Sequence, residues 1–191
     1  MGKIKVAQCE KNGKIIKGLY VIEPTVFYDE RGYFVETYNK NDMTAAGLDM
    51  EFVQDNQARS SKGVLRGLHY QKQFPQGKLV RALQGTVFDV AVDLRIHSET
   101  YGYWYGVELS ADNMKQFYIP EGFAHGYLVL SDTAVFAYKC TDFYHPGDEG
   151  GLAFDDKEIG VEWPVPEGVQ LIMSDKDKKW GSLSETFRFD R

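Results

Sequence analysis

The 191-residue sequence lacks the features that define several large classes of protein. It has only two cysteines, Cys9 and Cys140, which excludes a disulfide framework and leaves no cysteine motif spaced for a metal. It has no apolar run close to the ~18 residues of a membrane span. Nothing at its N-terminus resembles a signal peptide. We therefore expect a cytoplasmic protein with free thiols and no membrane partner.

Nucleotide-binding fingerprints are also missing, because there is no P-loop, no Gly-x-Gly-x-x-Gly after a strand and no internal repeat. The net charge of −6 argues against a broad nucleic-acid-binding face. This net charge is compatible with a local basic pocket for a small anionic ligand. The length fits one domain over residues 1–191, with a core large enough to be stable without disulfides.

Aromatic residues make up 14% of the chain, which favours strands over a helical bundle. Strands are expected over residues 3–9 and 14–22, because the Asn12-Gly13 pair between them is a strong hairpin signal. A turn over 29–32 precedes another expected strand over 33–38. One helix is expected within 39–47, with Asn41 or Asp42 as its cap and Gly47 as its end.

Beyond residue 52, short strands and turns alternate. Over residues 85–95 the apolar positions alternate with Asp89 and Asp93, so one strand face is apolar and the other carries carboxylates. Residues 127–139 are expected to form another hairpin. Many short strands at roughly ten-residue spacing indicate an all-β sandwich or barrel. In an eight-stranded jelly roll the two carboxylates would line an internal cavity.

The segment Gly63–Gln71 has the composition of a strand but carries Arg66 and His69. Successive side chains of a strand point to opposite faces, so these two should not share one unless the backbone is irregular. Gly67 lies between them, and an isolated glycine in a strand often marks a bulge. We expect a strand that brings a working histidine into a polar cavity; a hydrogen-bonded histidine at a strand edge is the alternative.

Metal catalysis is not expected from the four histidines. A metal-binding cupin needs a His-x-His pair, and here Tyr70 and Gln71 follow His69. His125 lies where a turn rich in Pro and Gly enters a strand, a common place for a binding residue. His97 and His145 lie in polar loops.

Two further side chains have open interpretations. Tyr138 has a phenol with an ordinary pKa of about 10, which could deliver a proton inside a pocket. A half-buried packing role is its alternative. Asp177 lies in a charged stretch that has the composition of a surface loop, within a tail expected to be loop from Gly168 with a helical turn over 182–188.

Ordered motifs over nearly the whole chain resemble those of the dTDP-4-dehydrorhamnose 3,5-epimerase family, whose fold is a metal-free, cupin-type jelly roll. The matching segments are Asp29–Glu36, Phe52–Asn56, Gly63–Gln71, Gly77–Arg81, Val87–Arg95, Tyr118–Gly126, Ala137–Tyr144 and Ser174–Asp177. No catalytic position departs from the family pattern.

The resemblance implies epimerisation of dTDP-4-dehydro-6-deoxy-D-glucose at C3 and C5, without a cofactor or metal. It implies that His69 is the base and Tyr138 the acid, and that Asp177 fixes the tautomer of His69 and strengthens it as a base. Lys78 would lie near the C4 oxygen. The implied substrate-binding residues are Arg31, Glu36, Gln54, Asn56, Arg66, His125, Tyr144, Glu149 and Lys176, with Arg66 and Arg31 at the diphosphate.

The resemblance also implies a homodimer in which N-terminal strands, about 1–24, contact the partner, so that Arg31 could serve either subunit. The tail spans 168–191. Two alternatives remain: an epimerase that inverts only C3 or C5 of another dTDP-deoxysugar, and a non-catalytic cupin that binds a nucleotide-sugar. The non-catalytic alternative predicts the loss of His69, Tyr138 or Asp177, and all three are present.

Overall fold

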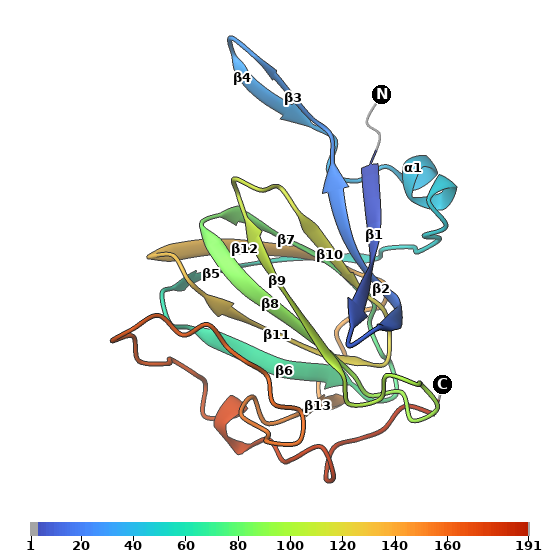
Figure 1. Ribbon diagram of the computed structural model, residues 1–191, viewed down its shortest axis with the longest axis vertical. Coiled ribbons are helices and arrows are strands. Elements are labelled where there is room, and N and C mark those ends of the chain that lie inside the picture. The colour runs from blue at the N-terminus through green and yellow to red at the C-terminus, as the bar shows by residue number, and fades with distance from the viewer. Residues whose placement is uncertain (1–3, 191) are drawn as a thin grey trace.

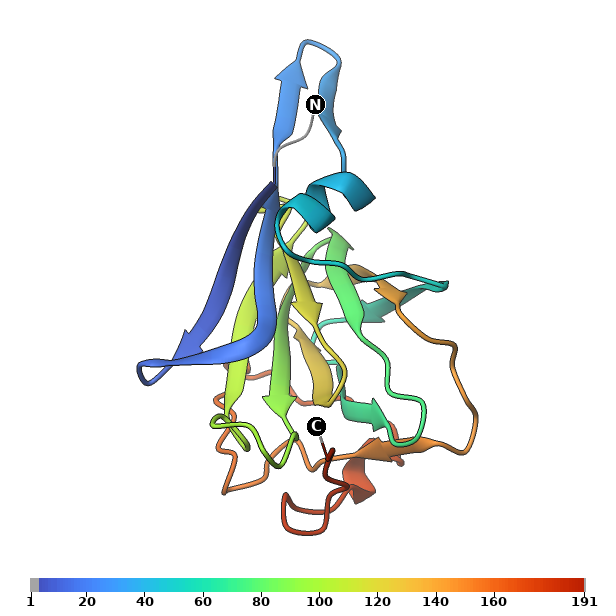
Figure 2. The same cartoon turned by 90° about the vertical axis from the view of Figure 1, so that its right-hand side faces the viewer.

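A computed structural model describes residues 4–190 as two antiparallel sheets packed face to face, with a protruding hairpin (Figures 1 and 2). The six-stranded sheet has the order β1 (Ile4–Lys11), β2 (Lys14–Pro24), β10 (Gln116–Ile119), β7 (Lys78–Gln84), β12 (Thr133–Cys140) and β5 (Gln54–Ser61). The five-stranded sheet has the order β13 (Glu149–Gly151), β6 (Leu65–Gln71), β11 (Phe123–Val129), β8 (Thr86–Asp93) and β9 (Trp104–Ser110). The predicted all-β jelly roll is confirmed.

The first four strands refine the predictions for the N-terminal part of the chain. The first hairpin is confirmed, with Asn12 and Gly13 both at positive φ in its turn, although residue 3 of the first predicted strand lies outside the described residues. The strand predicted over 33–38 ends at Val35, where β4 (Gly32–Val35) finishes its pairing with β3 (Val26–Asp29).

The single α-helix among the described residues is α1 (Lys40–Ala45). Its cap is Asn39 rather than Asn41 or Asp42, because Asn39 is extended and its side chain accepts from the backbone N–H groups of both. Gly47 follows the helix at a φ of +81°. In the tail, the 3₁₀ helix η1 lies at Asp177–Lys179. Within the helical turn predicted over 182–188, the backbone N–H groups of Glu185 and Thr186 donate to the carbonyls of Ser182 and Leu183, so one turn with i to i+3 hydrogen bonds is present.

Consecutive strands repeatedly cross between the sheets: β5 to β6, β7 to β8, β9 to β10 and β11 to β12. The hairpin predicted over 127–139 is therefore wrong. Its two strands exist, but β11 pairs with β6 and β8, whereas β12 pairs with β5 and β7. A strand that pairs across the turn and one that crosses to the opposite sheet have the same local alternation, so the sequence pattern does not separate them.

Strand β8 is buried on both faces. Its Val90 and Val92 pack under the C-terminal segment with Leu183 and Phe189. Its other face turns to the interior between the sheets, where Ala91 joins the main core. The carboxylates of Asp89 and Asp93 lie on this interior face as well, since they share the parity of Ala91.

The protruding hairpin of β3 and β4 extends away from both sheets (Figures 1 and 2). Four large aromatic residues on it are exposed: Phe27, Tyr28, Tyr33 and Phe34. No helix among residues 4–190 is long and apolar enough to cross a membrane.

Candidate active site

Strand β6 is irregular at Gly67, which has a φ of +133°. The pairing of β6 with β11 shifts register between His125 and Tyr127, so the expected bulge is present. A Cβ on Gly67 would lie 2.5 Å from Gly126 Cα, which explains the need for glycine where the two backbones approach. Because of this irregularity, Arg66 and His69 both line one cavity.

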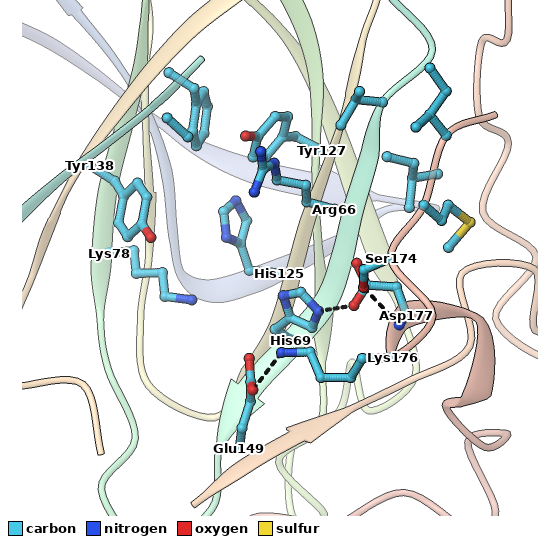
Figure 3. A pocket seen from close by; sticks show the side chains of 16 residues that line it. Arg66, His69, Lys78, His125, Tyr127, Tyr138, Glu149, Ser174, Lys176 and Asp177 are labelled. Atoms are coloured by element: carbon cyan, nitrogen blue, oxygen red, sulfur yellow. Dashed lines mark hydrogen bonds and ion pairs between the residues drawn. The ribbon is translucent and has the colours of Figure 1, made fainter. Parts of the chain in front are cut away.

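That cavity, of about 650 Å³, lies between the sheets and beneath the C-terminal segment (Figure 3). It brings together eight of the predicted site residues: Arg66, His69, Lys78, His125, Tyr138, Glu149, Lys176 and Asp177. They come from β6, β7, β11, β12, β13 and the tail. A neighbouring cavity of about 350 Å³ shares its lining with the first and adds Gln54, Asn56 and Tyr144.

His69 and Asp177 form a close pair at one wall of the cavity (Figure 3). His69 Nε2 lies 2.6 Å from Asp177 Oδ1, and the Asp177 side chain is only 4% exposed. Burial opposes ionisation of Asp177, but hydrogen bonds from His69 and Ser174 outweigh it and lower its pKa. An ionised Asp177 accepts a hydrogen bond from Nε2–H, so Nδ1 of a neutral His69 is left with a free lone pair.

A second pair, His125 and Asp89, lies deeper. His125 Nε2 is 3.0 Å from both carboxylate oxygens of Asp89, and Asp89 is fully buried. Burial lowers the pKa of His125 and raises the pKa of Asp89. His125 pairs directly with His69 across the strands, so two imidazoles lie side by side in the sheet.

The predicted role of Asp93 in lining the cavity is wrong. Asp93 instead accepts hydrogen bonds from Arg95, Ser98 and Thr100 in a buried network away from the cavity lining. Asp89 does not line the cavity either, but its carboxylate is hydrogen-bonded to the cavity residue His125. Both carboxylates share one face of β8, and their position along the strand decides that Asp89 contacts a cavity residue and Asp93 does not.

Tyr138 and Lys78 come from the six-stranded sheet, opposite His69 and His125 (Figure 3). Burial raises the pKa of Tyr138 to about 12, so its phenol stays protonated at neutral pH. Burial lowers the pKa of Lys78. The cavity therefore has an imidazole on one wall, and a protonated phenol beside the Lys78 side chain on the other.

Polar contacts link several residues that line the two cavities. Lys176 Nζ lies 2.6 Å from Glu149 Oε2 (Figure 3). Gln54 donates to Asn56 Oδ1 and accepts from the backbone N–H of Tyr144. These residues form a polar surface that continues from the reacting groups into the second cavity.

Two predicted site residues lie outside these cavities. Arg31 is at the tip of the protruding hairpin, where it pairs with Asp29 and its side chain is 85% exposed. Glu36 follows the hairpin and accepts from Asn39. Within this one chain, neither residue reaches His69.

The structure also adds residues that sequence patterns did not single out. Tyr127 and Ser174 line the first cavity, and the Trp180 ring meets the His69 ring edge-on at 6.2 Å between centroids. Tyr127 has the parity of His125 on the same strand, which was a usable signal. No group of three or more His, Cys, Asp or Glu among residues 4–190 is arranged to hold a metal ion.

Comparisons with known proteins agree on one family. A family model described as dTDP-4-dehydrorhamnose 3,5-epimerase matches residues 14–185. The dTDP-4-dehydrorhamnose 3,5-epimerase of Methanothermobacter thermautotrophicus is 54% identical over 89% of this chain and 92% of the relative.

Solved structures are similar as well. The epimerase of Legionella pneumophila, in complex with dTDP-4-keto-L-rhamnose, has a TM-score of 0.88 and 48% identity over 95% of this chain and 94% of that one. A 3'-monoepimerase from Streptomyces bikiniensis, in complex with dTDP-quinovose, has a TM-score of 0.80 and 32% identity over 87% of this chain and 84% of that one.

Proposed function

Because this chain belongs to the dTDP-4-dehydrorhamnose 3,5-epimerase family, we propose that the residues of its cavity carry out that family's reaction as follows. The protein is an isomerase that converts dTDP-4-dehydro-6-deoxy-D-glucose to dTDP-4-dehydro-L-rhamnose. Carbons C3 and C5 both flank the C4 ketone. A proton can leave either carbon because the resulting carbanion delocalises onto the ketone oxygen as an enolate.

His69 is the base and Tyr138 the acid in this proposal. Its main support is that the two side chains come from opposite sheets and line opposite walls of one cavity. A sugar ring between them would lose a proton to His69 Nδ1 on one face and receive one from Tyr138 on the other, which inverts the carbon. Asp177 holds the proton on Nε2 and stabilises the imidazolium that forms.

Lys78 stabilises the enolate oxygen. It lies on the same sheet as Tyr138, and it has no carboxylate partner within ion-pair distance among residues 4–190. Its ammonium group is therefore available to a developing negative charge. Deprotonation and reprotonation involve no net redox change, so the proposed steps need no cofactor.

The remaining cavity residues bind the rest of the substrate. Arg66 binds the diphosphate, since a guanidinium group suits phosphate oxygens. The other polar residues of the two cavities bind the sugar and nucleoside; they are Gln54, Asn56, His125, Tyr144, Glu149 and Lys176.

Solvent exchange tests the proposed roles. The protein is incubated with the dTDP-4-keto sugar in deuterated water, and C3 and C5 are followed by NMR. Deuterium should enter both carbons, whereas deuterium at only one would identify a single-centre epimerase. His69→Ala should abolish exchange at both carbons. If Tyr138→Phe completes inversion at the wild-type rate, Tyr138 is not the acid.

We also propose that the protein is a homodimer in which the protruding hairpin reaches a second copy of the chain. The hairpin exposes Tyr28 at 72% and Phe34 at 62%, and exposed apolar residues on an unpaired hairpin favour association. In a dimer of this kind, Arg31 and Glu36 would complete the partner's site rather than their own.

Mixed dimers test which site Arg31 serves. Arg31→Ala and His69→Ala proteins should each be nearly inactive alone. If Arg31 acts in the neighbouring subunit, a mixed dimer has one complete site and recovers activity after subunit exchange. Absence of recovery in verified mixed dimers would place Arg31 in its own site.

A charged substitution on the hairpin tests the dimer itself. Light scattering of Phe34→Asp should show a monomer.

Two broader proposals accompany this function. Residues 1–191 act as one domain, and limited proteolysis should yield no stable half of the chain. The protein acts in the cytoplasm, consistent with two buried cysteines that are both free thiols. Cell fractionation tests the location.

A further inference from the structure

The cavity contains two cations that no carboxylate neutralises. Its own carboxylates are both paired, Glu149 with Lys176 and Asp177 with His69. Arg66 and Lys78 have no such partner among residues 4–190. Lys78 is assigned above to the enolate oxygen. Arg66 therefore marks a second place where a negative charge is expected to bind.

Ser60 holds the Arg66 guanidinium across the two sheets. Ser60 lies on β5 and is 8% exposed, whereas Arg66 lies on β6 in the opposite sheet and is exposed to the cavity. Arg66 Nε and Nη2 donate to Ser60 Oγ at 3.3 and 3.2 Å. One edge of the guanidinium is thus fixed by a neutral acceptor, and its remaining N–H groups are left for a ligand.

Tyr127 places an unsatisfied hydroxyl at the same point. Its side chain is 95% buried, lines the cavity and stacks on Phe136 at 4.2 Å between ring centroids. Figure 3 shows Tyr127 beside Arg66. Ser60 lies close to the hydroxyl, yet the hydroxyl makes no hydrogen bond of acceptable geometry among the described residues.

A phenylalanine ring would fill the same space without the energetic cost of a buried hydroxyl that has no hydrogen-bond partner. Buried hydroxyls are normally hydrogen-bonded, so an unpartnered one beside a free guanidinium suggests that a ligand supplies the partner. A cation with a neutral O–H donor next to it, and no competing carboxylate, is chemistry for an anion rather than for a sugar hydroxyl.

We infer that Ser60 and Tyr127, which no comparison or motif singled out, are part of the diphosphate site already proposed for Arg66. Ser60 is a positioning residue that aims the Arg66 guanidinium, and the Tyr127 hydroxyl donates to a phosphate oxygen that Arg66 also binds. This inference rests on the proposed function for the identity of the anion.

Calorimetric titration with dTDP tests the subsite without requiring turnover. Ser60→Ala and Tyr127→Phe should each weaken dTDP binding about tenfold, the factor that corresponds to ~1.4 kcal/mol. Ser60→Thr, which keeps the hydroxyl, should bind nearly as wild type. Matched controls are Ser61→Ala on the exposed side of the same strand and Tyr105→Phe at a partly buried position packed against the core, and both should leave binding unchanged. Inorganic pyrophosphate should compete with dTDP less effectively in the two test variants.

Steady-state kinetics separate positioning from chemistry. In Ser60→Ala and Tyr127→Phe, KM for the nucleotide-sugar should rise while kcat stays within about twofold of wild type. Wild-type dTDP affinity in both variants, or a fall in kcat at unchanged KM, would overturn the inference. If Ser60→Ala fails to fold, as judged by its melting curve, Tyr127→Phe decides alone. Failure of the wild-type protein to exchange deuterium would reject the proposed function but not the dTDP result.

Discussion

Replacing Asp177 by asparagine gives the most informative single test of the proposed base. The substitution keeps the shape of a side chain that is 4% exposed and removes its charge. It also changes the hydrogen bond at His69 Nε2, now 2.6 Å from a carboxylate oxygen. An amide N–H can donate to Nε2, which would move the imidazole proton to Nδ1 and remove the lone pair that takes the substrate's proton.

The magnitude follows from the charge pair that forms during the reaction. With charge centres ~4 Å apart and an effective dielectric constant of ~20, attraction between imidazolium and carboxylate is ~4 kcal/mol. That energy corresponds to roughly a thousandfold in rate. The corresponding change in a Ser-His-Asp triad costs about ten-thousandfold, and it includes the wrong tautomer. We therefore expect a loss of between about a thousandfold and ten-thousandfold.

Deuterium incorporation at C3 and C5 measures this loss directly, and dTDP titration shows whether the site is otherwise intact. Exchange should fall at both carbons by a similar factor, because one base serves both. Affinity for dTDP should change little. An Asp177→Asn protein that binds dTDP normally and keeps more than a tenth of the wild-type exchange rate would refute the role given to this pair.

Three further predictions follow from other parts of the structure. Removing the charge in Asp93→Asn should destabilise the protein by ~3 kcal/mol or more, because Arg95 loses a buried partner, while dTDP affinity is unchanged; thermal melts and titration measure the two effects. Burial raises the pKa of Asp93, but hydrogen bonds from Arg95 and Ser98 outweigh it and bring the folded-state value below 3.8. The stabilisation is therefore complete above pH 3.8 and is lost as pH falls through the folded pKa, so melting temperatures of wild type and Asp93→Asn should converge in acid. Lys78→Met should lose about 100- to 1000-fold in kcat. Burial lowers the pKa of Lys78 below 10.5, so wild-type activity should decline with rising pH at a pH below 10.5. In Lys78→Arg this decline should move to higher pH, and a decline at the same pH would contradict the assignment. Gly67→Ala should cost ~1–3 kcal/mol for the positive φ alone, and more for the 2.5 Å approach to Gly126, with loss of exchange activity, whereas Gly13→Ala at an open turn is the control with no steric contact.

The sequence determined the local features of this protein. Alternating apolar residues predicted short strands, and Asn12-Gly13 predicted the first turn, because both depend on near neighbours in the chain. The conflict between Arg66 and His69 correctly pointed to irregular backbone at Gly67. The resemblance to a known family supplied the roles of His69 and Tyr138, which their local sequence alone had left open.

Tertiary structure decided which of these features meet. Local alternation is the same for a hairpin and for a crossing between sheets, so residues 127–139 were misassigned. Asp89 and Asp93 share a pattern, yet only Asp89 contacts a cavity histidine. Asp177, in a stretch with surface composition, is buried against His69 from 108 residues away. Ser60 likewise meets Arg66 from the opposite sheet. Such contacts depend on how sheets pair and where the tail crosses them, which is set by long-range burial rather than by any short segment.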